Sequence, residues 1–159
     1  MTPLLLLLAC TLGPHALDEW KAEVWTDSRI RHDPDFDRPD IAKGRGGRVL
    51  VLTADWGKLP IITDTQEYLN VVIALPRELD AGTSFSAANR SGFLRMGGMS
   101  VGYESREIEG TIHVVEVTAE GVVFDLDLVA RSPVIDRHAR GEKRVKGRVS
   151  TVFRAGPVY

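Results

Sequence analysis

The alternation of apolar and polar residues is clearest in the last third of the chain. In the segment 122–128 every second residue is apolar, and Asp125 and Asp127 stand between the apolar positions. The segment 145–153 has the same period, with basic residues at most of its polar positions. A period of two is typical of a β-strand that buries one face and exposes the other. We therefore predict two strands whose outer faces carry opposite charge.

The opposite charges predict that these two strands are neighbours in one sheet. We expect antiparallel pairing across the loop 132–143, so that Asp125 and Asp127 face Lys146, Arg148 or both. Such cross-strand pairs each contribute a few tenths of a kcal/mol to the stability of a sheet.

Further strands are predicted upstream. A strand over 108–118 reaches the segment 122–128 through a short loop containing Gly121, so that 107–154 forms a three-strand meander. The segments 49–53 and 70–75 are apolar runs that end at turn-forming residues. The fold class is therefore all-β, an antiparallel β-sandwich or small barrel of about seven to nine strands.

The segment 17–47 differs from the rest of the chain. It is rich in acidic residues, contains Pro34 and Pro39, and ends in the glycine- and arginine-rich sequence 43–48. The prolines exclude a regular helix, and the clustered glycines indicate a flexible connection. We expect an extended acidic arm and a Gly-rich linker over 17–47, with its tryptophans docked on a β domain over 48–159.

The first sixteen residues are predicted to be a signal segment. They hold a leucine run at 4–8 and no charged side chain. This run is too short to span a bilayer, which takes about 20 apolar residues, but it is typical of a secretory signal. The sequence Leu7-Leu8-Ala9-Cys10 resembles the lipobox of bacterial lipoproteins, in which the signal is cut before the cysteine and the thiol is acylated. The resemblance implies a membrane anchor through a lipid on Cys10.

Two other interpretations of this segment stay open. One is ordinary secretion with cleavage after Ala16, which gives a periplasmic or secreted protein. The other is a cytoplasmic protein with a buried or disordered N-terminal segment. The lipid anchor instead predicts an extracytoplasmic protein held at a membrane of the cell envelope.

Length, cysteine content and net charge exclude several classes of protein. A length of 159 residues fits one compact domain, and the single cysteine excludes an internal disulfide framework and a Cys-built zinc site. A net charge of −2 gives the chain no general affinity for polyanions. No cofactor is expected.

Basic residues nevertheless gather near the predicted loop 132–143. Candidates for binding an anionic lipid headgroup, a polysaccharide or another polyanion are Arg137, Arg140, Lys143 and Arg144. No aromatic residue stands among them, so nucleic acid is not expected as a partner. The alternatives are a solvated loop and a loop onto which the acidic arm folds.

One motif suggests an enzyme. Gly98-Met99-Ser100-Val101-Gly102 matches the GxSxG pattern of serine hydrolases, and Asp125 and His138 follow in the order acid, then histidine. Ser100, Asp125 and His138 are therefore candidates for a catalytic set. The alternating strands and helices of that fold are missing from the pattern, which favours a glycine-rich loop or bulge instead.

A second motif suggests a cation. Asp33, Asp35 and Asp37 place carboxylates at alternate positions and are candidates for binding calcium. The sequence does not complete an EF-hand, because Arg38 and Gly44 stand where that loop has glycine and glutamate. A solvated acidic loop is the alternative.

The sequence thus predicts an exported, lipid-anchored, non-enzymatic β domain with a binding or structural role in the bacterial envelope. An envelope protein or a polysaccharide is the expected partner besides the membrane. A serine hydrolase that uses Ser100 and a cation- or polyanion-binding module are the alternatives.

Overall fold

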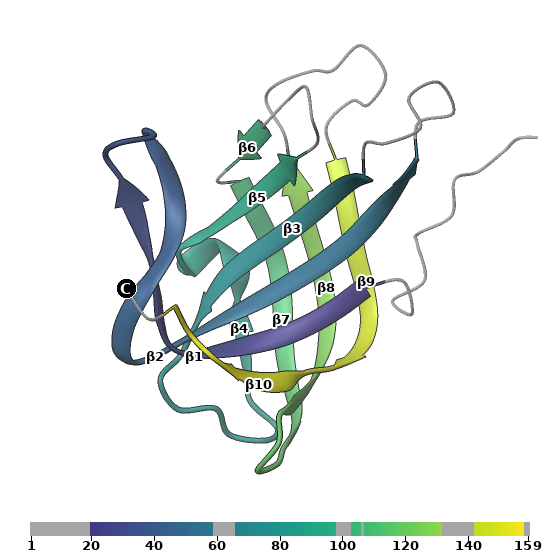
Figure 1. The fold of residues 1–159 in the computed structure, drawn as a ribbon. Helices are drawn as coiled ribbons and strands as arrows, with labels where there is room; N and C mark the ends of the chain where they lie inside the picture. The colour runs from purple at the N-terminus through teal and green to yellow at the C-terminus, as the bar shows by residue number, and fades with distance from the viewer. Residues whose placement is uncertain (1–19, 59–65, 98–102, 106, 132–141, 158–159) are drawn as a thin grey trace, which may run out of the picture.

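A computed structural model of the chain describes residues 20–58, 66–97, 103–105, 107–131 and 142–157. Most of these residues lie in β-strands, and a single turn of 3₁₀ helix covers Ala87–Asn89 (Figure 1). Among the described residues, no helix has the length and apolar character needed to cross a membrane.

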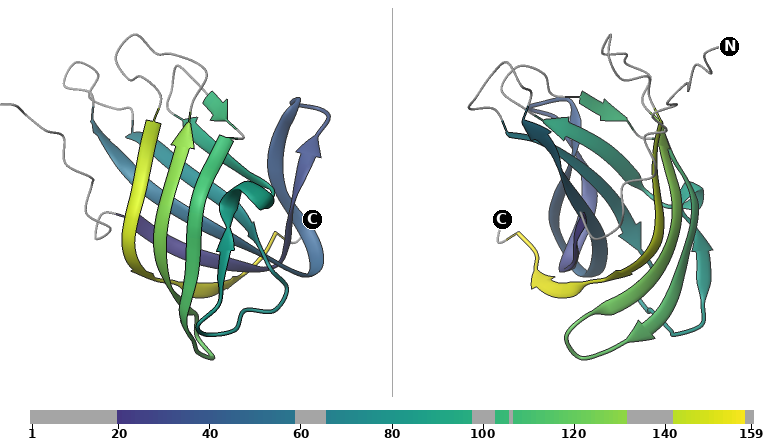
Figure 2. Two further views of the ribbon diagram at one scale, coloured as in Figure 1. Left: turned by 180° about the vertical axis from the view of Figure 1, so that it is seen from behind. Right: turned by 90° about the vertical axis from the view of Figure 1, so that its right-hand side faces the viewer.

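The strands form two sheets that pack face to face (Figure 2). The larger sheet has the order β10 (Val152–Ala155), β1 (Trp20–Asp33), β2 (Arg38–Lys58), β3 (Gln66–Leu75), β5 (Gly92–Gly97) and β6 (Tyr103–Ser105). The smaller has the order β4 (Ser84–Ser86), β7 (Glu107–Val117), β8 (Val122–Arg131) and β9 (Glu142–Ser150). All neighbours are antiparallel except β1 and β10. The predicted all-β sandwich is confirmed, and the described strands do not close into a barrel.

The main core lies between the two sheets. Strand β8 alternates buried and half-buried residues along its whole length up to Ala130, as its period of two predicts. Fully buried side chains from both sheets meet there, among them Val24, Leu50, Ile73, Ile112 and Phe124.

The predicted pairing of charged faces is confirmed on the outer face of the smaller sheet. Asp125 lies opposite Arg148, and Asp127 lies opposite Lys146. The Arg148 guanidinium donates two hydrogen bonds of 2.8 Å to the Asp125 carboxylate, and Lys146 Nζ lies 3.0 Å from Asp127. The hydrogen bonds from Arg148 lower the pKa of Asp125, and those from Lys146 and Arg144 lower the pKa of Asp127.

The last predicted strand divides between the two sheets. Strand β9 ends at Ser150, and after Thr151 the chain continues as β10 beside β1 in the larger sheet. Thr151 holds this corner, because its hydroxyl donates to the Val122 carbonyl at 2.8 Å and accepts from the Val122 N–H at 3.0 Å. The meander predicted over 107–154 therefore ends at β9.

The segment expected to be an arm and a linker belongs to the larger sheet. Strand β1 pairs with β10 on one side and with β2 on the other, and residues 43–48 lie within β2. Among the described residues, the sandwich therefore begins at Trp20 rather than at residue 48.

Candidate functional site

The long hairpin of β1 and β2 is bent by a large bulge. Thr26 lies opposite Arg48 and Ser28 lies opposite Lys43, so Asp27 alone faces residues 44–47. Asp27 has a φ of 49° and Gly46 a φ of 68°, and the Asp27 carboxylate accepts a hydrogen bond of 2.9 Å from the Gly46 N–H. Glycine and aspartate tolerate this left-handed conformation better than most residues, which explains their place in the bulge.

Beyond the bulge, the hairpin folds over the outer face of the larger sheet (Figure 1). Ile30 and Ile41 pack there in a second apolar cluster, whose buried members are Val49, Val51, Val72 and Phe93. Arg95 on β5 fixes the outer end of the hairpin. Its guanidinium donates a hydrogen bond of 2.6 Å to the Pro39 carbonyl and lies 3.7 Å from the Asp40 carboxylate. The bent hairpin is therefore held at both its base and its tip.

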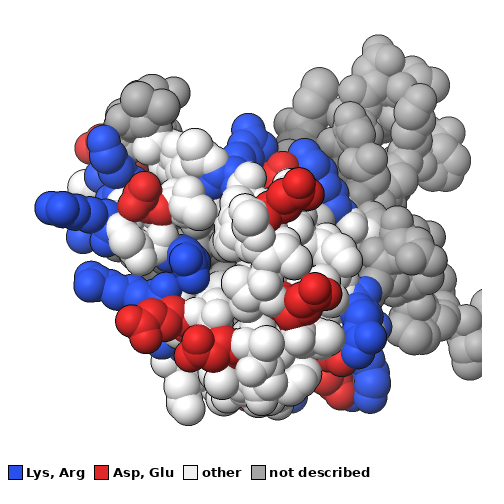
Figure 3. All heavy atoms as spheres, turned by 90° about the horizontal axis from the view of Figure 1, so that it is seen from below, with Lys and Arg blue, Asp and Glu red and all other residues white. Residues whose placement is uncertain are grey.

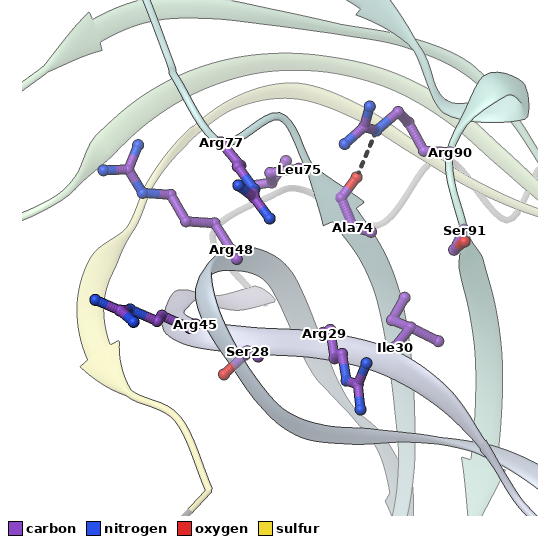
Figure 4. Close-up of a pocket in the computed structure, with 12 residues that line it drawn as sticks. Ser28, Arg29, Ile30, Arg45, Arg48, Ala74, Leu75, Arg77, Arg90 and Ser91 are labelled. Atoms are coloured by element: carbon purple, nitrogen blue, oxygen red, sulfur yellow. Dashed lines mark hydrogen bonds between the residues drawn. The ribbon is translucent and has the colours of Figure 1, made fainter.

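A groove of about 390 Å³ lies where the bent hairpin meets the sheet (Figure 4). One side is formed by the hairpin near the bulge, from 28–30 and 44–48. The other side is formed by the end of β3, the loop after it, and the residues that lead into β5. The described residues that line it are Ser28, Arg29, Ile30, Gly44, Arg45, Gly47, Arg48, Ala74, Leu75, Arg77, Arg90 and Ser91.

None of the described lining residues is acidic, and five are arginines, namely Arg29, Arg45, Arg48, Arg77 and Arg90. Arg90 is oriented by a 3.0 Å hydrogen bond from its Nε to the Ala74 carbonyl. The guanidinium of Arg48 lies over the ring of Phe153, 5.8 Å from its centroid. Seen from below in Figure 3, Lys and Arg side chains gather on the side of the molecule that carries the bent hairpin.

The groove arginines differ from those elsewhere in the sandwich. Within the part of the chain that the structure describes, none of the five forms a salt bridge. Five other described arginines each pair with a carboxylate, namely Arg95, Arg131, Arg144, Arg148 and Arg154. The described residues thus include no carboxylate in a salt bridge with a groove arginine. Guanidinium groups in such a setting bind carboxylates and phosphates through paired N–H donors.

Of the residues predicted for polyanion binding, only Arg144 has a described side chain, and it does not line the groove. Arg137 and Arg140 are outside the described residues, as is the side chain of Lys143. Arg144 lies on the outer face of the smaller sheet, where its guanidinium is 2.9 Å from Asp127. The described basic residues of β9 therefore bind the acids of β8, whereas the bent hairpin lies on the larger sheet.

Only Asp125 of the predicted catalytic set belongs to the described residues. Ser100 and His138 lie outside the described residues, as does Cys10. Asp125 instead forms a row with His113 and Ser84, which occupy facing positions on β7 and β4. Ser84 Oγ lies 2.7 Å from His113 Nδ1, but both oxygens of Asp125 accept hydrogen bonds from Arg148. Asp125 therefore serves the sheet as an ion-pair partner.

The three predicted calcium ligands do not converge. Asp33 accepts a hydrogen bond of 3.0 Å from the backbone N–H of Asp35, and Asp37 lies 3.2 Å from His32 Nε2. Among the described residues, no group of three His, Cys, Asp or Glu side chains is arranged to hold a metal ion. These carboxylates form the turn at the tip of the hairpin.

The groove was not predicted from the sequence, because its arginines come from segments far apart in the chain. The one local signal was the sequence Gly44-Arg45-Gly46-Gly47, which is compatible with a linker as well as with a bulge. Comparison with protein-family models, curated proteins and solved structures finds no match to this chain.

Proposed function

We propose that this chain is a non-enzymatic binding module of the bacterial envelope that holds an anionic ligand in the arginine groove. The observation that carries the proposal is the gathering of five guanidinium groups without carboxylate partners in the described structure around one groove. Like charges in one place repel each other, and an anion that neutralises them relieves this repulsion.

The expected location supports a binding role. The lipobox-like sequence that ends at Cys10 implies a lipid anchor, and several acyl chains hold a protein firmly at a membrane. An anchored module with a basic groove is suited to retain an anionic component of the envelope. The alternative of a serine hydrolase depends on Ser100, which lies outside the described residues.

Retention on a heparin column tests the anion-binding function. The whole chain carries a net charge of −2, yet we expect it to be retained at low salt through the groove. The double variant Arg45→Gln/Arg77→Gln removes two groove charges and should elute at clearly lower salt. Arg31→Gln/Arg38→Gln is the matched control, because it makes the same charge change on exposed hairpin residues outside the groove.

The outcomes separate clearly. Equal elution of the two double variants would show that retention follows net charge rather than the groove. Flow-through of the unaltered protein at low salt would reject the proposed function.

Palmitate labelling in the producing cell tests the anchor. We expect label on the intact protein and none on the Cys10→Ala variant. Label that persists in the variant would reject the anchor on Cys10. An unlabelled protein in the medium or periplasm would reject the anchor and favour cleavage after Ala16.

A further inference from the structure

We infer that the ligand of the arginine groove is an extended chain of phosphate groups rather than a single ion or an acidic polysaccharide. This inference rests on the proposed anion-binding function and specifies the chemistry of its ligand. It follows from the spread of the arginines, the hydrogen-bonding groups of the lining and the absence of aromatic residues among the described lining residues.

The guanidinium groups are spread along the groove. Figure 4 shows Arg45 and Arg48 on one side of the site and Arg90 on the other, with Arg77 between them and Arg29 on the far side of the hairpin ribbon from Arg90. The groove volume of about 390 Å³ lies in the range of about 300–1,000 Å³ that organic ligands occupy. A single oxyanion therefore reaches only part of this set, whereas a chain with repeated charges reaches all of it.

The lining offers many donors and few side-chain acceptors. Each guanidinium has five N–H donors and no acceptor. The only lining hydroxyls among the described residues are those of Ser28 and Ser91, and Ser28 is 1% exposed and donates to the Thr26 carbonyl. The Ala74 carbonyl already accepts from Arg90. A ligand made mostly of acceptor oxygens matches the guanidinium donors of this lining better than a polysaccharide, which also carries many hydroxyl donors.

No aromatic side chain is among the described residues that line the groove. Single-stranded nucleic acids gain much of their affinity from bases stacked on aromatic rings. The apolar lining is limited to Ile30, Ala74 and Leu75. The groove is thus suited to a phosphate backbone without bases.

A competition series with the full mature protein tests the inference. The probes are linear inorganic polyphosphate, polyglutamate of matched charge and orthophosphate, with affinities measured by calorimetry at several salt concentrations. We expect polyphosphate to bind at least about tenfold more tightly than either other probe, with an affinity that falls steeply with salt.

The two double variants localise this preference. Arg45→Gln/Arg77→Gln should weaken polyphosphate binding by about tenfold or more and reduce the slope of log Kd against log salt by about two. Arg31→Gln/Arg38→Gln should stay within about twofold of the unaltered protein. Circular dichroism of both variants confirms that the sandwich is folded.

Each of the remaining outcomes would overturn a different part of the inference. Equal binding of polyphosphate and polyglutamate, lost in the groove variant, would overturn the phosphate chemistry and leave the anion-binding function intact. Orthophosphate that binds as tightly as polyphosphate would overturn the extended ligand. Binding of none of the probes would overturn this inference, and flow-through of the unaltered protein on heparin would then overturn the proposed function as well.

Discussion

The Asp27 carboxylate accepts a hydrogen bond of 2.9 Å from the backbone N–H of Gly46, across the bulge between β1 and β2. The hydrogen bond spans the point where Asp27 faces residues 44–47 and the strands change direction. Because of this bend, the hairpin forms one wall of the groove. Arg45 and Arg48 lie within or beside the bulge, so the bend also sets where their positive charges stand.

The Asp27→Ala substitution tests the role of this contact. It removes the hydrogen bond and places alanine at a φ of 49°, and together these changes should lower the free energy of unfolding by about 1–2 kcal/mol. Asp27→Asn is the control, because asparagine accepts the same hydrogen bond and tolerates the left-handed conformation. Urea denaturation measures both, and equal losses in the two variants would contradict a structural role for the bond.

The apolar contacts of Ile30 and Ile41 should hold the bent hairpin on the sheet. Replacing both with serine removes their packing on the cluster that contains Val72 and Phe93. We expect faster amide hydrogen exchange within residues 28–43 and unchanged exchange in β7 and β8. Unchanged exchange in the hairpin would show that Arg95 and the bulge hold it without these side chains.

The ion pairs between β8 and β9 predict an acid-sensitive component of stability. The pKa values of Asp125 and Asp127 lie below their ordinary value of 3.8 in the folded protein, because Arg148, Lys146 and Arg144 donate hydrogen bonds to them. The unfolded chain therefore binds protons first, so this stabilisation is present above pH 3.8 and is lost as the pH falls through the folded pKa values.

Thermal unfolding between pH 6 and about pH 2 measures this component. The Asp125→Asn/Asp127→Asn variant should lose less stability over that range than the unaltered protein. High salt should reduce the difference, because the pairs are solvent-exposed. Parallel curves for the two proteins would show that the pairs do not contribute.

Thr151 is expected to stabilise the corner where the chain passes between the sheets. Thr151→Val removes the hydroxyl that bonds both to the Val122 carbonyl and to the Val122 N–H, leaving a buried donor without its partner. The expected loss is about 1–3 kcal/mol, and Thr151→Ser should retain most of the stability. A loss in Thr151→Ser with none in Thr151→Val would assign the effect to the methyl group instead.

The sequence was sufficient to predict the β8–β9 pairing, because alternation marks the buried face and charge marks the partner strand. The division between β9 and β10 was not predictable in this way. The alternation with a period of two runs unbroken through Val149, Thr151 and Phe153. It is unbroken because the chain passes from the inner face of one sheet directly to the inner face of the other. A pattern that reports burial does not report which sheet a strand joins.

The groove could not be predicted for a different physical reason. Arg29, Arg45, Arg77 and Arg90 are brought together by the bend of the hairpin, and that bend depends on backbone angles at Asp27 and Gly46. Clustered glycines permit such angles but also permit an unstructured linker. Local composition therefore left the position of these charges open.

The most direct test of the central claim is the location of anion binding, measured by amide chemical shifts during a titration with polyphosphate. We predict that the largest changes fall on residues 28–30, 44–48, 74–77 and 90–91, which line or adjoin the groove. Changes concentrated on Arg144, Lys146 and Arg148 of β9 instead, with the groove residues unmoved, would contradict the claim.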